Sequence, residues 1–264
     1  MKREEYYMQR KVLFEIVKQM RFREGAFLQK IPQEKYKSFA VRQINAWNIE
    51  LMLRNMERFE FLKYPMNMYY SLAKYSSIPM ASFDPQKRRE DYRKWAKEWK
   101  NNFIGMDFAF DIDNKNLKKA LEDTKKIKEF FDERNIPYKL AFSGNKGFHI
   151  EIPQENIVGI KEPDEWVLAY QSLVEIIKRK LKVKSLDSSI TDAKRIFKVK
   201  YSWDVKTGLI CLPLTDEQFE NFTIDIVTPE NVIKISNLGF RGLLIRNPNS
   251  KIHFYEFIKS LKNQ

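Results

Sequence analysis

The spacing of hydrophobic positions changes along the chain. In the first hundred residues they recur at helical intervals with charged residues between them, which predicts helices over about residues 3–20, 40–63 and 86–100. No linker, repeat or low-complexity stretch divides the sequence. We therefore expect one domain over residues 1–264, with a mainly helical part in residues 1–100.

The second part, residues 101–264, alternates between short apolar runs and helical patterns. Strands are predicted at 106–112, 138–142 and 148–152, helices at 117–134, 163–181 and 254–261, and a strand-turn-strand between about 195 and 214. The order strand, helix, hairpin, helix, strand is typical of an α+β fold of the ferredoxin-like or RNA-recognition kind. We expect an RNA-recognition-like antiparallel sheet at the centre of this α/β core.

Composition narrows the function classes. Lys and Arg number 48 against 35 Asp and Glu, a formal net charge of +13, which points to a polyanionic partner such as nucleic acid. One cysteine, Cys211, and two histidines exclude an internal disulfide and a Cys-rich zinc site. The charged start carries no secretory signal, and no apolar run approaches the ~20 residues of a membrane span. We expect a cytoplasmic protein without membrane contact.

Two acids, Asp111 and Asp113, follow the apolar run 108–110. On a strand, residues i and i+2 share a face, so the two carboxylates would lie side by side at the strand's end. Such a pair repels itself unless a cation sits between the carboxylates, and Mg²⁺ or Mn²⁺ favours these ligands. The alternative is a solvated strand end without a metal.

The segment Ser143–His149 (SGNKGFH) is predicted to form a turn between two strands. Backbone N–H groups around Gly144 can hold phosphate, Ser143 adds a hydroxyl, and Lys146 adds a point charge. His149 begins the next strand and can donate to a phosphate. The alternative is an ordinary hairpin turn with a structural histidine.

A third acid, Asp187, follows a basic helix. On its own it does not indicate a particular function. The stretch 191–209 then clusters cations around Tyr201 and Trp203, a composition that suits a nucleotide surface. The alternative is a solvated basic edge strand. A Walker P-loop, a GxGxxG motif and a nucleophile elbow are absent from the sequence.

Four motifs in order resemble the catalytic small subunit of archaeal and eukaryotic primases, in the archaeo-eukaryotic primase superfamily. They read FAFDID at 108–113, SGNKGFH at 143–149, LD at 186–187 and YSWDVKTG at 201–208. The stretches RFREGAF at 21–27 and YPMNMYYSLAKYSSIP at 64–79 also look like that subunit. The similarity covers most of the chain and implies a primase (prim-pol) fold.

The resemblance implies roles for individual residues. Asp111, Asp113 and Asp187 would be catalytic and bind two Mg²⁺ or Mn²⁺ ions. The nucleotide triphosphate would be held by Ser143, Gly144, Lys146, His149, Arg195, Lys198 and Lys206. The reaction would be two-metal nucleotidyl transfer from NTPs or dNTPs on a single-stranded DNA template. A primase large subunit is the expected partner.

The chain departs from the family pattern at two points. The family usually carries a zinc knuckle near these motifs, and this sequence cannot form one, so we expect no zinc. Asp204 stands where a phosphate-contacting histidine is expected. An acid there would repel a triphosphate unless it binds metal or turns outward.

Three functions remain open on sequence alone. The first is a primase or primase-polymerase that makes short primers. The second, favoured by Asp204 and the missing zinc knuckle, is a gap-filling or end-joining repair polymerase of the same superfamily. The third is a non-catalytic nucleic-acid-binding module on an RNA-recognition-like sheet. The cations of the helix predicted over 86–100 would follow the backbone of a template strand.

Overall fold

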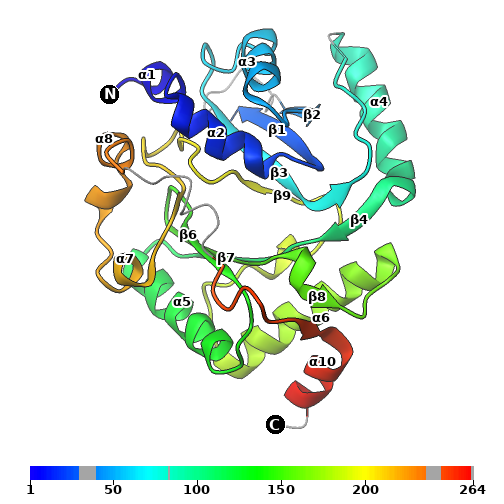
Figure 1. Cartoon of the computed structure of the whole chain (residues 1–264), viewed down its shortest axis with the longest axis vertical. Helices are drawn as coiled ribbons and strands as arrows, with labels where there is room; N and C mark the ends of the chain where they lie inside the picture. Colours follow the sequence, from blue (N-terminus) through cyan, green and yellow to red (C-terminus); the bar gives the residue numbers. More distant parts are fainter. Residues whose placement is uncertain (30–39, 83, 236–244, 263–264) are drawn as a thin grey trace.

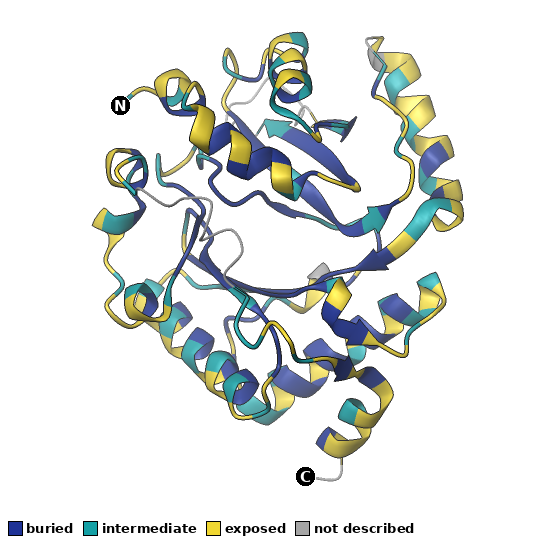
Figure 2. Cartoon of the chain, in the orientation of Figure 1, coloured by how far each residue is buried: buried dark blue, intermediate teal, exposed yellow. Residues whose placement is uncertain are grey.

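The computed structural model describes the whole chain except residues 30–39, 83, 236–244 and 263–264. Two antiparallel sheets face one another, and helices cover their outer sides (Figure 1). Helices α2 (Arg10–Gln19) and α3 (Ile49–Arg58) lie over one sheet, and α5 (Leu117–Asp132) and α6 (Pro163–Leu181) lie over the other. Figure 2 shows that the strands between these layers are largely buried, while the helices expose one face.

The first sheet is built mostly from the N-terminal part of the chain. Its strands are β1 (Arg23–Gln29), β2 (Ala40–Ile44), β3 (Met66–Tyr75), β4 (Phe103–Met106) and β9 (Ile196–Lys198). The order is β2-β1-β3-β4, and β9 pairs with β3. Its helices are α1 (Arg3–Tyr7), α2 (Arg10–Gln19) and α3 (Ile49–Arg58).

The second sheet has the expected RNA-recognition-like arrangement. Its strands are β5 (Phe108–Asp113), β6 (Lys139–Phe142), β7 (Gly147–Ile152) and β10 (Leu212–Pro213), in the order β10-β6-β7-β5. Helices α5 (Leu117–Asp132) and α6 (Pro163–Leu181) cover its outer face. An antiparallel bridge between Ile112 and Leu186 adds residues 185–187 beside β5, where such a fold places its fourth strand.

The remaining elements surround the two sheets. Within the described residues they are α4 (Pro85–Glu98), β8 (Ile157–Val158), α7 (Asp216–Glu220), α8 (Pro229–Val232), β11 (Ile252–His253) and α10 (Phe254–Lys262), together with four short 3₁₀ turns. Strands β8 and β11 pair in parallel. Within the described residues, no helix combines the length and apolar character that crossing a membrane requires.

The alternation along β5 separates the core from the space between the sheets. Phe108 stacks on Tyr170 of α6, with ring centroids 4.9 Å apart, and Phe110 meets Phe131 of α5 edge-on at 5.4 Å. Burying each such side chain contributes about 1.5–3 kcal/mol. Because neighbouring residues on a strand point to opposite faces, Asp111 and Asp113 must face the other sheet.

The structure corrects the expectation that residues 1–100 are mainly helical. Strands β1, β2 and β3 lie in this part, and the helix expected over 40–63 begins only at Ile49. Asn48 caps this helix by accepting a hydrogen bond from the Leu51 N–H (2.8 Å). The strands were missed because they bury polar residues: Glu24 is fully buried and held by the guanidinium of Arg42 at 2.7 and 2.6 Å.

The expectations for the second part agree more closely with the structure. The helix over 163–181 has the bounds of α6, and the helix over 117–134 ends two residues early. The strand-turn-strand expected between 195 and 214 is divided between the sheets: β9 joins the first sheet and β10 the second.

Gly147 sets how closely β7 approaches β5. A Cβ atom at this position would lie 2.0 Å from the Ile112 carbonyl oxygen and 2.5 Å from the Asp113 carboxylate. At Gly105 an added Cβ would instead meet the flexible side chain of Gln154, at 2.4 Å. Backbone cannot yield as a side-chain end can, so of these two positions Gly147 is the one that the fold requires to be glycine.

We predict that Gly147→Ala lowers the free energy of unfolding by about 1–3 kcal/mol, the usual range for overpacking. Urea denaturation measures this. The matched variant Gly105→Ala should lose clearly less, because Gln154 can rotate away. Equal losses for the two variants would contradict the importance of the β5–β7 approach.

Candidate active site

The structure brings the three predicted acids together at one edge of the second sheet. The Asp187 N–H donates to the Asp111 carbonyl at 2.9 Å, and the Asp113 N–H donates to the Ser185 carbonyl at 2.9 Å. Asp187 therefore lies directly beside Asp111, and Asp113 lies two residues further along the same strand. One short antiparallel bridge therefore brings together acids that are more than 70 residues apart in the sequence.

The position of Asp187 depends on a residue that the sequence did not reveal. Asp123 of α5, which is buried, accepts hydrogen bonds from the N–H groups of Lys184 (3.0 Å) and Ser185 (2.9 Å). These bonds hold the segment before Asp187 against α5. No motif marks Asp123, since an acid in a charged helix is usually solvated.

The three carboxylates differ in their partners. Asp113 lies 3.2 Å from the amine of Lys146, and Asp187 lies 3.7 Å from the guanidinium of Arg195. Within the described residues, Asp111 has no Lys or Arg at ion-pair distance, and its buried Oδ1 has no hydrogen bond, with His149 Nε2 3.6 Å away. Burial and the neighbouring charges of Asp113 and Asp187 raise the pKa of Asp111 to about 7.

This donor set suits a divalent cation. A buried carboxylate oxygen without a partner, between two further carboxylates, is the environment that a hard cation stabilises. Across the described part of the chain, no three His, Cys, Asp or Glu side chains are already gathered into a metal-binding group. Asp113 and Asp187 are instead directed to Lys146 and Arg195, cations that offset part of their charge.

The turn at residues 143–147 is organised by its first side chain. The Ser143 hydroxyl accepts from the N–H groups of Asn145 and Gly147, both at 3.3 Å, and its own N–H donates to the Gly147 carbonyl at 2.9 Å. Gly144 adopts a positive φ of 84°, which favours glycine. Ser143 therefore shapes the turn in addition to lining the space in front of it.

His149 lies on β7 directly opposite Asp111 of β5. It is buried against Phe197, with ring centroids 4.1 Å apart, and its Nδ1 has no hydrogen-bond partner among the described residues. Burial, followed by the charges of Lys200 and Lys198, lowers the pKa of His149 well below its usual value. The imidazole is thus neutral at pH 7 and has one nitrogen available.

Asp204 does not turn outward. It is buried and forms an ion pair with Lys198. Its Oδ1 accepts from the N–H groups of Lys206 (2.9 Å) and Thr207 (3.2 Å), and the Thr207 hydroxyl donates to the Gly144 carbonyl at 2.6 Å. Asp204 therefore joins the 204–208 loop to the turn at Gly144 and offsets the charge of Lys198.

A cavity of about 300 Å³ connects these groups. Its lining includes six of the predicted residues, namely Asp111, Asp113, Ser143, His149, Arg195 and Lys198. Asp187 adjoins it through Asp111 and Arg195, Lys146 through Asp113, and Gly144 through Lys198. Lys206 is exposed on the 204–208 loop and is the one predicted residue without a side-chain contact to this group in the described structure.

Phe197 and Asn145 also line the cavity and were not predicted as site residues. Asn145 lies within the SGNKGFH segment, so its position in the turn was available from the motif. Phe197 was recognisable only as an apolar residue between two cations, and nothing in that pattern indicates that it packs against His149.

The fold is a mixed α+β architecture built on two antiparallel sheets. The polymerase domain of Mycobacterium tuberculosis ligase D, solved in complex with DNA, has a TM-score of 0.59 to this chain at 10% identity, covering 91% of this chain and 88% of that domain. This similarity confirms the mixed helix and antiparallel-sheet fold expected for a primase-polymerase.

Sequence relatives make the class more specific. The DNA primase small subunits PriS of Pyrobaculum calidifontis and Pyrobaculum islandicum are 25% and 26% identical over 242 aligned residues, which span 72% of this chain and 72% of each relative. No family model matches the sequence. The relatives and the fold support an archaeo-eukaryotic primase-like family for this chain.

The raised pKa of Asp111 has a testable consequence for stability without metal. Because the folded protein holds this proton more tightly than the unfolded chain, the charge on Asp111 destabilises the fold increasingly from about pH 4 up to about pH 7. In EDTA, Asp111→Asn should therefore gain stability relative to the unchanged protein as pH rises from 5 to 8, by a few kcal/mol at order of magnitude.

Urea denaturation at pH 5, 6, 7 and 8 measures this difference. Asp164→Asn, a change at an exposed acid of α6, is the matched control and should show little pH-dependent gain. A constant difference between Asp111→Asn and the unchanged protein across this range would contradict the assigned environment of Asp111.

Proposed function

We propose that this protein is a DNA-directed nucleotidyl transferase that acts as a primase or primase-polymerase. The main support is the Asp111 carboxylate, whose buried oxygen lacks a partner between Asp113 and Asp187. Beside it lie a glycine-containing turn and several cations, the groups a nucleoside triphosphate requires. The primase small subunits among the relatives agree with this assignment.

Asp111, Asp113 and Asp187 would hold Mg²⁺ or Mn²⁺, which when bound activates the attacking hydroxyl and neutralises charge on the transferred phosphoryl group. The protein's own cations would share the second task. Arg195 and Lys146 now neutralise Asp187 and Asp113. With the carboxylates bound to cations, both side chains would be free to contact phosphate oxygens.

His149 would act as a neutral hydrogen-bond donor to the nucleotide. Its low pKa removes the imidazolium form at pH 7, and packing on Phe197 fixes the ring. Lys198 would contribute mainly through Asp204, since the two are paired in the interior. The acid at position 204 therefore need not repel the triphosphate, because its charge is compensated by Lys198 and by the N–H groups of the 204–208 loop.

The template strand would follow the basic helix α4. Lys87, Arg89, Arg93, Lys94 and Lys97 are exposed on it. Phosphate contacts from such side chains give sequence-independent, salt-sensitive affinity. A primase large subunit is the proposed protein partner, as expected from the resemblance to primase small subunits.

We predict that replacing both Asp111 and Asp113 by Ala lowers template-directed synthesis at least about a hundredfold, because charge stabilisation at the transferred phosphoryl group is lost. The assay supplies template, nucleotides and Mn²⁺, and products are resolved by length. Asp164→Ala, a change to an exposed acid remote from the site, should retain activity. Equal synthesis by the double variant would exclude the assigned site.

The same assay distinguishes the alternatives. Synthesis without a primer supports a primase, whereas extension of an annealed primer alone supports the gap-filling polymerase. Metal-independent DNA binding with no synthesis under either condition would leave the non-catalytic binding module.

A further inference from the structure

Helix α2 carries a row of exposed side chains that the proposed function does not use. Lys11, Phe14 and Lys18 follow one another at intervals of three and four residues, which places them on one face of the helix. Arg21 and Phe22 extend the row into the turn after the helix. All five residues are exposed, and together they form what we call the α2 surface.

Two phenylalanines on the α2 surface leave much of their rings open to solvent. Phe14 is 52% exposed and Phe22 is 48% exposed. The Lys18 amine lies 5.0 Å from the ring centroid of Phe14. The guanidinium carbon of Arg21 lies 5.0 Å from the ring centroid of Phe22. A single exposed apolar residue is common on a protein surface, but two exposed rings that each lie beside a cation have the composition of a nucleic-acid surface.

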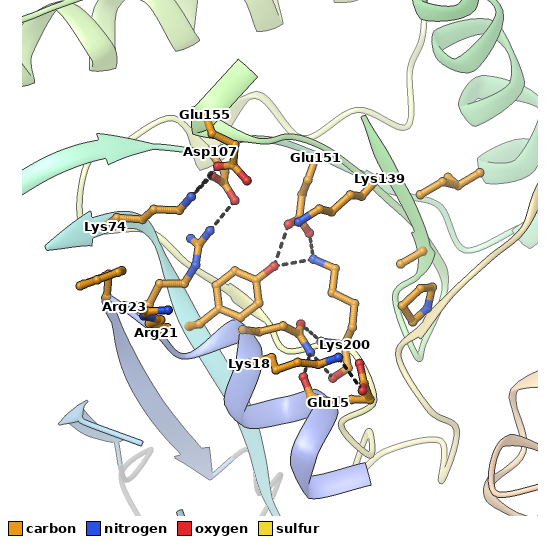
Figure 3. Close-up of a pocket in the computed structure, with 16 residues that line it drawn as sticks. Glu15, Lys18, Arg21, Arg23, Lys74, Asp107, Lys139, Glu151, Glu155 and Lys200 are labelled. Atoms are coloured by element: carbon orange, nitrogen blue, oxygen red, sulfur yellow. Dashed lines mark hydrogen bonds and ion pairs between the residues drawn. The ribbon is translucent and has the colours of Figure 1, made fainter. Parts of the chain in front are cut away.

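The charge of this segment is mostly positive. Between residues 10 and 22 the sequence holds four cations and one acid, Glu15. Glu15 is buried and lies 2.6 Å from the amine of Lys18, an ion pair drawn in Figure 3. Lys11 donates one hydrogen bond to the Ile233 carbonyl. A lysine has three N–H donors, so both amines can still contact an anion. No acid of this segment is exposed beside the two rings.

The two rings belong to one continuous surface. Phe14 lies against Lys18. Lys18, Arg21 and Phe22 are exposed lining residues of one cavity of about 220 Å³, and Figure 3 shows Lys18 and Arg21 on its wall. Cations therefore lie between the two rings, as phosphates lie between the successive bases of a strand.

We propose that the α2 surface binds single-stranded nucleic acid without regard to sequence. Bases would stack on the open faces of Phe14 and Phe22, while Lys11, Lys18 and Arg21 would contact the phosphates. A single strand fits this surface, because its unpaired bases expose the flat faces on which aromatic side chains stack. The positive charge of the segment complements the strand.

This surface is separate from the groups assigned to catalysis and to the template. Its five residues do not line the cavity that contains Asp111. Figure 1 shows α4 at the right edge of the molecule, away from α2. The α2 surface uses no carboxylate, so binding should persist in EDTA. It should also persist in the Asp111→Ala, Asp113→Ala double variant, so that a failure of one proposal does not imply a failure of the other.

The experiment measures the fluorescence anisotropy of a labelled oligo(deoxythymidine) with the full chain in EDTA. We expect saturable binding by the unchanged protein. Replacing both Phe14 and Phe22 by Leu should weaken it about tenfold or more, the usual effect of losing base–aromatic stacking. Tyr255→Leu, which removes an exposed ring of α10, is the matched control and should bind as the unchanged protein does.

The salt dependence of binding separates the phosphate contacts from the stacking. Arg21→Gln should lower the slope of log affinity against log salt concentration by about 0.7, the effect of one lost phosphate contact to a single strand. Lys118→Gln, the same charge change at an exposed lysine of α5, should keep the original slope. The Phe14→Leu, Phe22→Leu double variant should also keep this slope while it loses affinity.

Two results would overturn the proposal. The first is an equal affinity of the Phe14→Leu, Phe22→Leu and Tyr255→Leu proteins for the strand, which would leave the α2 surface for a protein partner. The second comes from ultraviolet cross-linking of a strand that contains iododeoxyuridine. We expect mass spectrometry to locate the cross-links at Phe14 or Phe22, and cross-links confined to α4 would contradict this. Urea denaturation checks that the variants remain folded.

A parallel titration with oligo(uridine) identifies the kind of strand. Tighter binding of oligo(uridine) indicates RNA, and tighter binding of oligo(deoxythymidine) indicates DNA. Equal affinity indicates that the surface accepts both. Each of these results supports the proposal when the Phe14→Leu, Phe22→Leu double variant loses the binding.

Discussion

The central constraint in this protein is that two sheets enclose charged side chains between them. Strands β5, β6 and β7 direct Phe and Ile side chains to α5 and α6, so the intervening positions must face the other sheet. Asp111, His149 and Glu151 occupy such positions. Because isolated charges are unstable in an interior, each requires a partner, a shifted pKa or a bound ligand. The structure shows the first two solutions: Glu151 is paired with Lys200, and the pKa values of Asp111 and His149 are shifted.

At the two ends of the charged layer between the sheets, the pKa values of buried groups shift in opposite directions. At one end Asp111 lacks a cation, and its pKa rises. At the other end burial lowers the pKa of Lys139, although the charge of Asp107 acts against this shift. Both shifts follow from burial, which disfavours the charged form of each group. A protein of high positive charge thus contains an acidic edge, because many of its cations lie on exposed surfaces such as α4.

Much of the second sheet was predictable because its strands obey simple alternation around apolar residues. Phe108, Phe110 and Ile112 revealed β5, and the spacing of Asp111 and Asp113 fixed their shared face. The first sheet was not predictable in this way, because β1 buries Glu24 under Arg42 and β3 contributes Tyr70 to an ion-pair network. The meeting of Asp187 with Asp111 came from the family resemblance. Its physical basis is the pair of hydrogen bonds that Asp123 accepts from the backbone N–H groups at 184–185. These bonds depend on tertiary packing that no local sequence pattern encodes.

The tie between Asp123 and the segment before Asp187 has a consequence for protein design. Asp111 and Asp113 are carried by a regular strand, but Asp187 lies on a single bridge whose register is set by α5. If the three acids were grafted onto another sheet, Asp111 and Asp113 would keep their positions relative to each other. The position of Asp187 along the neighbouring strand would no longer be fixed. The smallest transferable unit is therefore β5, the helix that follows it and the segment 184–187 together, a module that joins a strand, a helix and a loop.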